Sequence, residues 1–92
     1  MERFYSRDLQ CEVQQIQVRT ARNLFNDGCT IYLQSSNMAF DNFWQKPIDI
    51  NRSRLGYKET FETICNNFRY YNCSNEQGNY IHYYVKVSDL KN

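Results

Sequence analysis

The distribution of aromatic residues is the feature that most constrains the fold of this chain, because a small domain must either bury its rings in the core or expose them on its surface. Between positions 40 and 84 the aromatic residues are Phe40, Phe43, Trp44, Tyr57, Phe61, Phe68, Tyr70, Tyr71, Tyr80, Tyr83 and Tyr84. A chain of 92 residues builds one modest core and cannot hide every tyrosine ring in that set. Tyr and Trp bring large apolar area with a polar tip and little rotamer entropy. We therefore expect some of these rings to form a contact surface.

Composition predicts one folded domain over residues 1–92. Hydrophobic residues at 41% and charged residues at 23% are ordinary for a globular protein. A formal net charge of +1 gives no global field that would steer the chain onto nucleic acid or membrane. The N-terminal segment MERFYSRDLQ is charged, and no stretch approaches the roughly 18 apolar residues that span a bilayer. We expect a cytoplasmic protein that makes no membrane contact.

Apolar residues at helical spacing predict two helices. The first covers 6–26, with Ser6 as its N-cap and Gly28 as its stop. Its main apolar stripe consists of Leu9, Val13, Ile16, Thr20 and Leu24. A second stripe on nearly the opposite side consists of Cys11, Val18, Ala21 and Phe25. A twofold contact through Val18 and Phe25 would make a homodimer. The second helix is expected over 58–67, with one narrow face made of Phe61, Ile64, Cys65 and Phe68.

Alternating apolar residues predict the strands. Residues 29–34 form one strand, and 48–50 add a short edge strand. In the first strand the inward residues are Ile31 and Leu33, and the outward residues are Thr30 and Tyr32. Residues 69–73 and 80–87 flank a turn-rich segment and predict a hairpin. The order α-β-(β)-α-β-β predicts an α+β domain, with two helices on one face of a small antiparallel sheet of three to four strands.

The opposite face of this sheet is expected to carry a layer of rings, namely Tyr32, Tyr80, His82 and Tyr84, joined by Tyr70 or Tyr71. Such a layer resembles the stacking platforms that bind single-stranded nucleic acids. The locally basic segment 46–58 carries the cations Lys46, Arg52, Arg54 and Lys58. These cations would clamp phosphates or an acidic partner, or would simply keep a loop solvated. The rings have an equally plain interpretation, because Tyr is a good strand former.

The irregular segment 35–57 concentrates Phe40, Phe43 and Trp44 in its middle. A Trp beside a Phe suits an interface anchor, since hot spots are rich in Trp. A long loop must also be pinned, and burying Trp44 in the core would pin it. We expect Trp44 to be buried; its exposure would strengthen the case for recognition.

The chain shows no constellation of catalytic groups. His82 is the only histidine, and a pair with Cys73 across the hairpin would lack an orienting acid at a recognisable spacing. The cysteines Cys11, Cys29, Cys65 and Cys73 lack the C-x2-4-C pair that is typical of zinc sites. We expect free thiols, no catalytic residues, no metal and no cofactor.

The segments NNFRYYNC and GNYIHYYVKV, with NFWQKP upstream, resemble short proteins of phages and mobile elements in low-GC bacteria. The resemblance implies a small domain that binds and blocks a host protein such as a nuclease complex, as anti-CRISPR proteins do. Many such inhibitors are acidic DNA mimics, whereas this chain is not acidic. The leading hypothesis is therefore a non-enzymatic interaction module that acts by steric occlusion. Its expected contact residues are Phe43, Trp44, Arg52, Arg54, Tyr80 and Tyr84.

Overall fold

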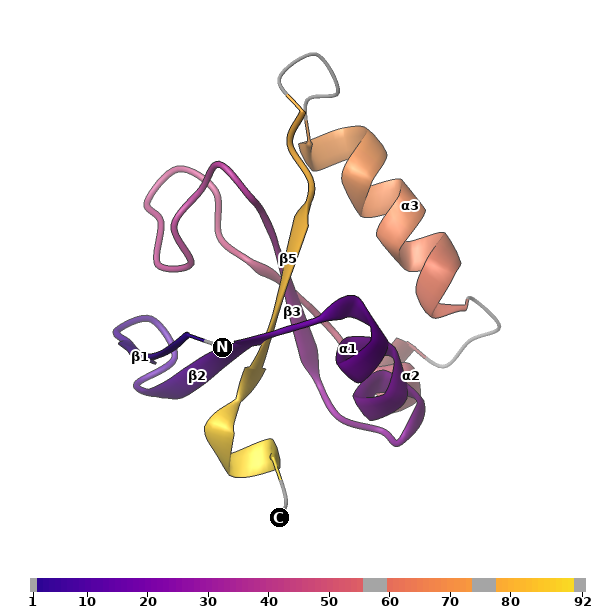
Figure 1. The fold of residues 1–92 in the computed structure, drawn as a ribbon, viewed down its shortest axis with the longest axis horizontal. Coiled ribbons are helices and arrows are strands. Elements are labelled where there is room, and N and C mark those ends of the chain that lie inside the picture. Colours follow the sequence, from indigo (N-terminus) through magenta and orange to yellow (C-terminus); the bar gives the residue numbers. More distant parts are fainter. Residues whose placement is uncertain (1, 56–59, 74–77, 91–92) are drawn as a thin grey trace.

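Five antiparallel strands form one sheet in the order β1-β2-β5-β3-β4. The computed structural model describes residues 2–55, 60–73 and 78–90, without the side chains of Arg54 and Leu55. The strands are β1 (Arg3–Ser6), β2 (Cys11–Ile16), β3 (Ile31–Ser35), β4 (Ile48–Ile50) and β5 (Ile81–Lys86). The helices are α1 (Val18–Asn26), the single turn α2 (Arg52–Leu55) and α3 (Phe61–Asn72), and a 3-10 turn (Val87–Asp89) follows β5. Figure 1 shows α1 and α3 on the same side of β5.

The predicted α+β class is confirmed, and α1 and α3 both pack on one face of the sheet. The sheet has five strands where three to four were expected, and the order of elements along the chain differs. The short edge strand at 48–50 is present as β4, which pairs with β3.

The predicted helix over 6–26 is wrong in its first half, which forms the β1–β2 hairpin. Val13 and Ile16 are three positions apart, which matches a helical stripe, but in a strand this spacing puts them on opposite faces. Accordingly, Val13 belongs to one core cluster and Ile16 to the other. Ser6 Oγ does accept a hydrogen bond from the backbone N–H of Leu9, at 3.2 Å. This bond has the spacing of an N-cap, but here it closes the hairpin turn.

The second half of that prediction is correct, since α1 occupies 18–26. The chain leaves the helix through Gly28, whose φ of 98° lies in the left-handed region that glycine adopts without strain. The backbone N–H of Gly28 donates to the carbonyl of Phe25, and that of Cys29 donates to Leu24. Gly28 therefore ends the helix, as the sequence predicts.

The predicted strand over 69–73 is also wrong, because α3 continues to Asn72. Tyr70 and Tyr71 are typical of strands, but β propensity depends on context and yields to tertiary packing. Phe61, Cys65 and Phe68 recur at helical spacing and are all buried, so the helix is held on the sheet along its length. The side chain of Thr60 caps the helix by accepting from the backbone N–H of Thr63. The turn at 74–77 lies outside the described residues.

Two apolar clusters lie on the two faces of the sheet. The helix-side cluster joins α1 and α3 to the inward residues of the strands, and its largest members are Phe25, Ile31, Leu33, Phe61, Phe68, Tyr83 and Val85. The loop-side cluster consists of Val13, Tyr32, Phe40 and Tyr84, with Phe4, Leu9 and Cys11 packed against it. Alternation along β5 is as predicted, with Ile81, Tyr83 and Val85 on the helix side and Tyr84 on the loop side. The sheet is thus covered on both faces, whereas the sequence predicted an open one.

Phe25 cannot make the predicted twofold contact with Val18. Its ring is 2% exposed and lies inside the helix-side cluster, whereas Val18 is 44% exposed at the start of α1. The second apolar stripe of the predicted helix is therefore a core stripe. Among the described helices, none has the length and apolar character needed to cross a bilayer.

Candidate functional site

The loop 36–47 crosses the face of the sheet opposite the helices, and Phe40 fastens its middle. Phe40 is buried, and its ring meets Tyr84 edge-on with ring centroids 4.7 Å apart. It also contacts Phe4 at 5.6 Å and Tyr32 at 5.9 Å in the same edge-to-face manner. Edge-to-face packing of this kind adds stabilisation to the burial of the rings. Phe40, rather than Trp44, is the aromatic residue that pins this loop.

The side chain of Gln34 hydrogen-bonds to two separate parts of the loop, at Ala39 and at Gln45. It lies on β3 and is fully buried. Its Nε2 donates to the carbonyls of Ala39 at 3.3 Å and Gln45 at 2.8 Å. Its Oε1 accepts from Gln45 Nε2 at 3.1 Å and from the backbone N–H of Ser35 at 2.9 Å. These four hydrogen bonds fix the path of the chain, because breaking any of them would leave a buried polar group without a hydrogen-bond partner.

Asp41 ties the loop to the β1–β2 hairpin. One carboxylate oxygen accepts from Ser6 Oγ at 2.7 Å, and the other accepts from the backbone N–H of Arg7 at 2.8 Å. Burial acts to raise the pKa of Asp41, but these hydrogen bonds outweigh it and lower the pKa below its ordinary value. Nearby, Lys46 Nζ meets Asp8 at 2.8 Å in a largely exposed ion pair that adds little.

Two rings stand out from the end of this fastened loop. Asn42 Oδ1 accepts from the backbone N–H groups of Trp44 at 2.7 Å and Gln45 at 3.0 Å, which makes a tight turn around its side chain. Phe43 and Trp44 are 86% and 85% exposed. Their rings meet edge-on with centroids 5.3 Å apart. We call Phe43 and Trp44 the aromatic tip.

The aromatic tip overturns the expectation that Trp44 is buried. Two large rings in water, on a loop held by buried hydrogen bonds, are an unfavourable arrangement for a chain that only needs to fold. The same arrangement suits binding, because a partner meets rings that are already in place and little ordering entropy is lost.

The other expected contact residues do not all join the tip. Tyr84 is buried against Phe40, so it cannot be a contact residue as expected. Tyr80 is exposed at the base of the loop, where its backbone exchanges hydrogen bonds with Ser36. Arg52 donates to the carbonyl of Asn26 at the end of α1, so it lies with α2 on the other side of the molecule from the loop (Figure 1). The side chain of Arg54 lies outside the described part of the chain.

The expected tyrosine platform is not exposed. Tyr32 and Tyr84 are buried under the loop. Only Tyr80 and His82 remain at the rim, with ring centroids 5.3 Å apart, and His82 Nδ1 lies 3.3 Å from the Tyr84 hydroxyl. Of the other candidates, Tyr70 and Tyr71 lie on α3, on the opposite face of the sheet. These rings therefore do not form one continuous stacking surface.

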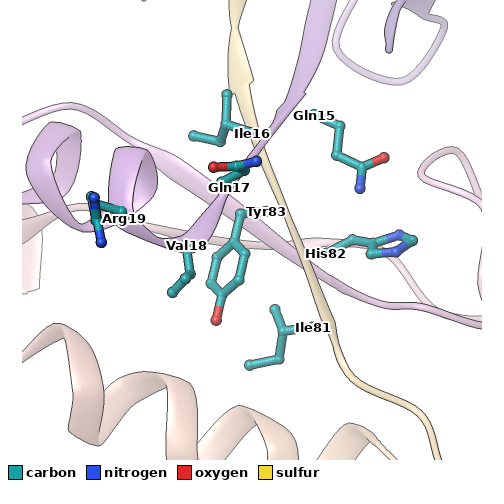
Figure 2. A pocket seen from close by; sticks show the side chains of 8 residues that line it. All are labelled: Gln15, Ile16, Gln17, Val18, Arg19, Ile81, His82 and Tyr83. Atoms are coloured by element: carbon teal, nitrogen blue, oxygen red, sulfur yellow. The ribbon is translucent and has the colours of Figure 1, made fainter. Parts of the chain in front are cut away.

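A hollow of about 570 Å³ opens where β2 turns away from β5. Figure 2 shows Gln15 and His82 on one side of these strands and Val18 and Tyr83 on the other. A neighbouring hollow of about 380 Å³ shares Gln15 and His82. The polar lining of the larger hollow consists of two amides, one guanidinium, one imidazole and the Tyr83 phenol, without a carboxylate, thiol or aliphatic hydroxyl beside them. Its side chains can donate hydrogen bonds, but they do not form a catalytic set.

The thiols give no reactive centre within the described residues. Burial raises the pKa of Cys65 to about 11 and that of the adjacent Tyr83 hydroxyl to about 12, so both stay protonated at neutral pH. The pair considered from the sequence, Cys73 and His82, is separated by the sheet, since Cys73 lies in the helix-side cluster and His82 faces the loop side. The four cysteines form no disulfide with one another, and two of them, Cys65 and Cys73, are buried. No group of three metal-ligating side chains occurs in the described segments.

Comparisons of this chain with protein-family models, curated proteins and solved structures find no match.

Proposed function

We propose that this chain is a small non-enzymatic protein-interaction module whose anchor is the aromatic tip, Phe43 and Trp44. The observation that carries the proposal is the pairing of nearly full exposure at the tip with a loop fixed by Phe40, Gln34 and Asp41. Hot spots in protein interfaces are enriched in Trp and depend on pre-organised side chains that enter a pocket of the partner. The tip projects, so the matching surface on the target is concave and apolar.

A protein target is favoured over nucleic acid by what surrounds the tip. The nearest cation along the chain, Lys46, is paired with Asp8, and Arg52 is bonded to the end of α1. A nucleic-acid site needs a basic groove that follows the phosphates, and the net charge is only +1. Tyr32 and Tyr84, which would have stacked bases, lie under the loop.

The resemblance to small phage and mobile-element proteins favours a host factor, such as a nuclease complex, as the target. The tip would then act by steric occlusion, with the standard burial of about 800 Å² on each partner. Tyr80, exposed at the base of the loop, extends the contact at its rim.

The experiment compares two aromatic pairs of similar exposure. Tyr70 and Tyr71 on α3 are 79% and 78% exposed and also pack edge-on, so they match the tip in chemistry but lie on the other face. A lysate of a low-GC bacterium is passed over three immobilised proteins: the wild type, the tip variant Phe43→Ser/Trp44→Ser and the α3 variant Tyr70→Ser/Tyr71→Ser. We expect the tip variant to lose its specific protein by at least about 30-fold, and the α3 variant to retain it.

Trp44 is the only tryptophan in the chain, which allows a direct readout. A 5-fluorotryptophan label at this position gives one 19F signal, which should shift and broaden on titration with the captured protein. Retention of that protein by the tip variant, with an unmoved 19F signal, rules out the tip as anchor. A 19F shift with single-stranded oligonucleotides that disappears at high salt would favour the nucleic-acid alternative.

A further inference from the structure

Within the described part of the chain, no strand pairs with the outer edge of β1. The N–H of Gln15 donates to the carbonyl of Glu2 at 2.9 Å, so positions 2 and 15 form a hydrogen-bonded pair of the β1–β2 ladder. Such pairs alternate along an antiparallel ladder, so Phe4 and Ser6 also direct their backbone groups toward β2. Arg3 and Tyr5 therefore direct their N–H and C=O groups away from the sheet, at the edge that Figure 1 shows on the flank of the molecule.

The other edge of the sheet, β4, is protected against pairing with a further strand. β4 is only three residues long, follows Pro47, which has no N–H to donate, and carries the charge of Asp49 at its centre. Short length, proline and charge are the usual means by which edge strands avoid pairing. β1 contains neither proline nor an acid. Its one charge, Arg3, is held against its own sheet by hydrogen bonds to Gln14 Oε1 at 2.8 and 3.0 Å.

We propose that β1 pairs antiparallel with β1 of a second copy of this chain, with Arg3 opposite Tyr5 and Phe4 opposite Phe4. Only outward-facing positions can exchange hydrogen bonds, which leaves few registers. Pairing Arg3 with Arg3 sets like charges opposite each other. Pairing Tyr5 with Tyr5 sets Arg3 opposite Arg7 and Phe4 opposite the buried Ser6. The register of Arg3 with Tyr5 avoids both conflicts.

The loop side of this interface is apolar. Phe4 is half-buried, and its ring already contacts Phe40 and Tyr84. In the chosen register the two Phe4 residues form the close, non-hydrogen-bonded kind of pair, with Cα atoms about 4.5 Å apart. The loop-side clusters of the two copies then join into one through an aromatic cross-strand pair.

The helix side of the interface is complementary in charge. Tyr5, 61% exposed, is covered by Arg3 of the second copy. Glu12 lies opposite Tyr5 on β2 of the same copy. In the dimer, the Arg3 guanidinium of one copy would exchange its hydrogen bonds to its own Gln14 for a place over the Tyr5 ring and beside Glu12 of the other copy. A cation above a ring and beside a carboxylate is favourable, and the twofold axis repeats the contact.

This dimer has a consequence for the aromatic tip. A twofold axis that relates antiparallel neighbours within one sheet is perpendicular to that sheet, so both loop sides face the same way. The two tips, carried by the two 36–47 loops, would therefore project from one face of a ten-stranded sheet, as a bivalent binder requires. The dimer itself does not depend on the tip, so each proposal can fail without the other.

Sedimentation equilibrium tests the proposal. Wild type should form dimers in a concentration-dependent manner below about 1 mM, the range in which weak specific association is measurable. Tyr5→Pro removes an outward N–H and leaves the β1–β2 ladder intact, since an edge strand tolerates proline where the N–H faces solvent. The dissociation constant should rise at least about tenfold, because symmetry removes the bond twice. Phe43→Ser/Trp44→Ser should dimerise like wild type, which excludes association through the tips.

The register is tested by oxidation. Phe4→Cys places two thiols opposite each other on the twofold axis, within the span of a disulfide, whereas Arg3→Cys faces Tyr5 and should not cross-link with itself. Wild type under the same conditions controls for the native cysteines. A wild type that remains monomeric at about 1 mM, or a Tyr5→Pro variant that is folded by circular dichroism and dimerises like wild type, overturns the proposal. Equal cross-linking of both cysteine variants overturns the register.

Discussion

Gln34 is the residue on which the path of the loop depends. Replacing it with Met keeps the volume but removes every hydrogen bond to Ala39, Gln45 and Ser35. We expect a loss of about 2–3 kcal/mol in the free energy of unfolding, because polar groups of the loop are left unpaired. The fluorescence anisotropy of Trp44 should also fall, since the tip is no longer held.

Gln17→Met is the matched control for this prediction. Gln17 is exposed at the N-cap of α1 and makes no capping hydrogen bond with its side chain. The same change there should leave both denaturant unfolding and Trp44 anisotropy unchanged within error. If Gln34→Met behaves like Gln17→Met, the loop is fixed by its rings alone.

At the scale of the element, the loop 36–47 carries a pH dependence through Asp41. The lowered pKa means that the folded state favours the ionised carboxylate. Its contribution is present above the unfolded pKa of about 3.9 and is lost as the pH falls through the still lower folded pKa. We expect Asp41→Asn to cost about 1–2 kcal/mol at neutral pH, because the charge is lost and one of the two accepting oxygens becomes an amide nitrogen that cannot accept.

The measurement is the difference in free energy of unfolding between wild type and Asp41→Asn, followed from pH 7 into the acid range. Other carboxylates titrate equally in both proteins and cancel. The difference should shrink as the pH falls below the unfolded pKa of Asp41. A constant difference across the whole range would show that the hydrogen bonds to Ser6 and Arg7 do not depend on the charge.

An element could be predicted from the sequence where its apolar residues follow either helical or alternating spacing along its whole length. An element whose apolar residues fit both spacings could not. The alternation of β5, the stop at Gly28 and the buried stripe of α3 are all correct. Val13 and Ile16 fit a helix and a strand equally well, because three positions bring residues together in one and separate them in the other. Only the pairing of β2 with β5 decides between them, and that contact is distant in sequence.

The candidate site could be predicted in part, because residue type is visible in the sequence whereas tertiary packing is not. Phe43 and Trp44 stand out by residue type, and both are in the tip. Which ring of the loop is buried depends on the space between Phe4, Tyr32 and Tyr84, which no local pattern reveals. Gln34 and Asp41 gave no usable signal either, since one is a single polar residue in an apolar strand and the other lies in an irregular segment.

At the scale of the whole molecule, one sheet separates two apolar layers, and Phe40 is the main residue of the layer without a helix. We expect Phe40→Ala to cost about 3–5 kcal/mol, a large fraction of the stability of a small domain, so Phe40→Leu serves as the milder variant. Phe61→Leu is its counterpart across the sheet, where the ring packs on Phe25 and Tyr83. Both leucine variants should lower the melting temperature by similar amounts.

The two layers differ in what they hold. Phe40 fastens the loop that carries Trp44, whereas Phe61 fastens α3 to the opposite face. Below the melting transition, Phe40→Leu should therefore lower Trp44 anisotropy, and Phe61→Leu should leave it at the wild-type value. An equal fall in both variants would mean that the layers act as one unit. A fall only in Phe40→Leu would show that the binding loop can loosen while the helix-side core stays intact.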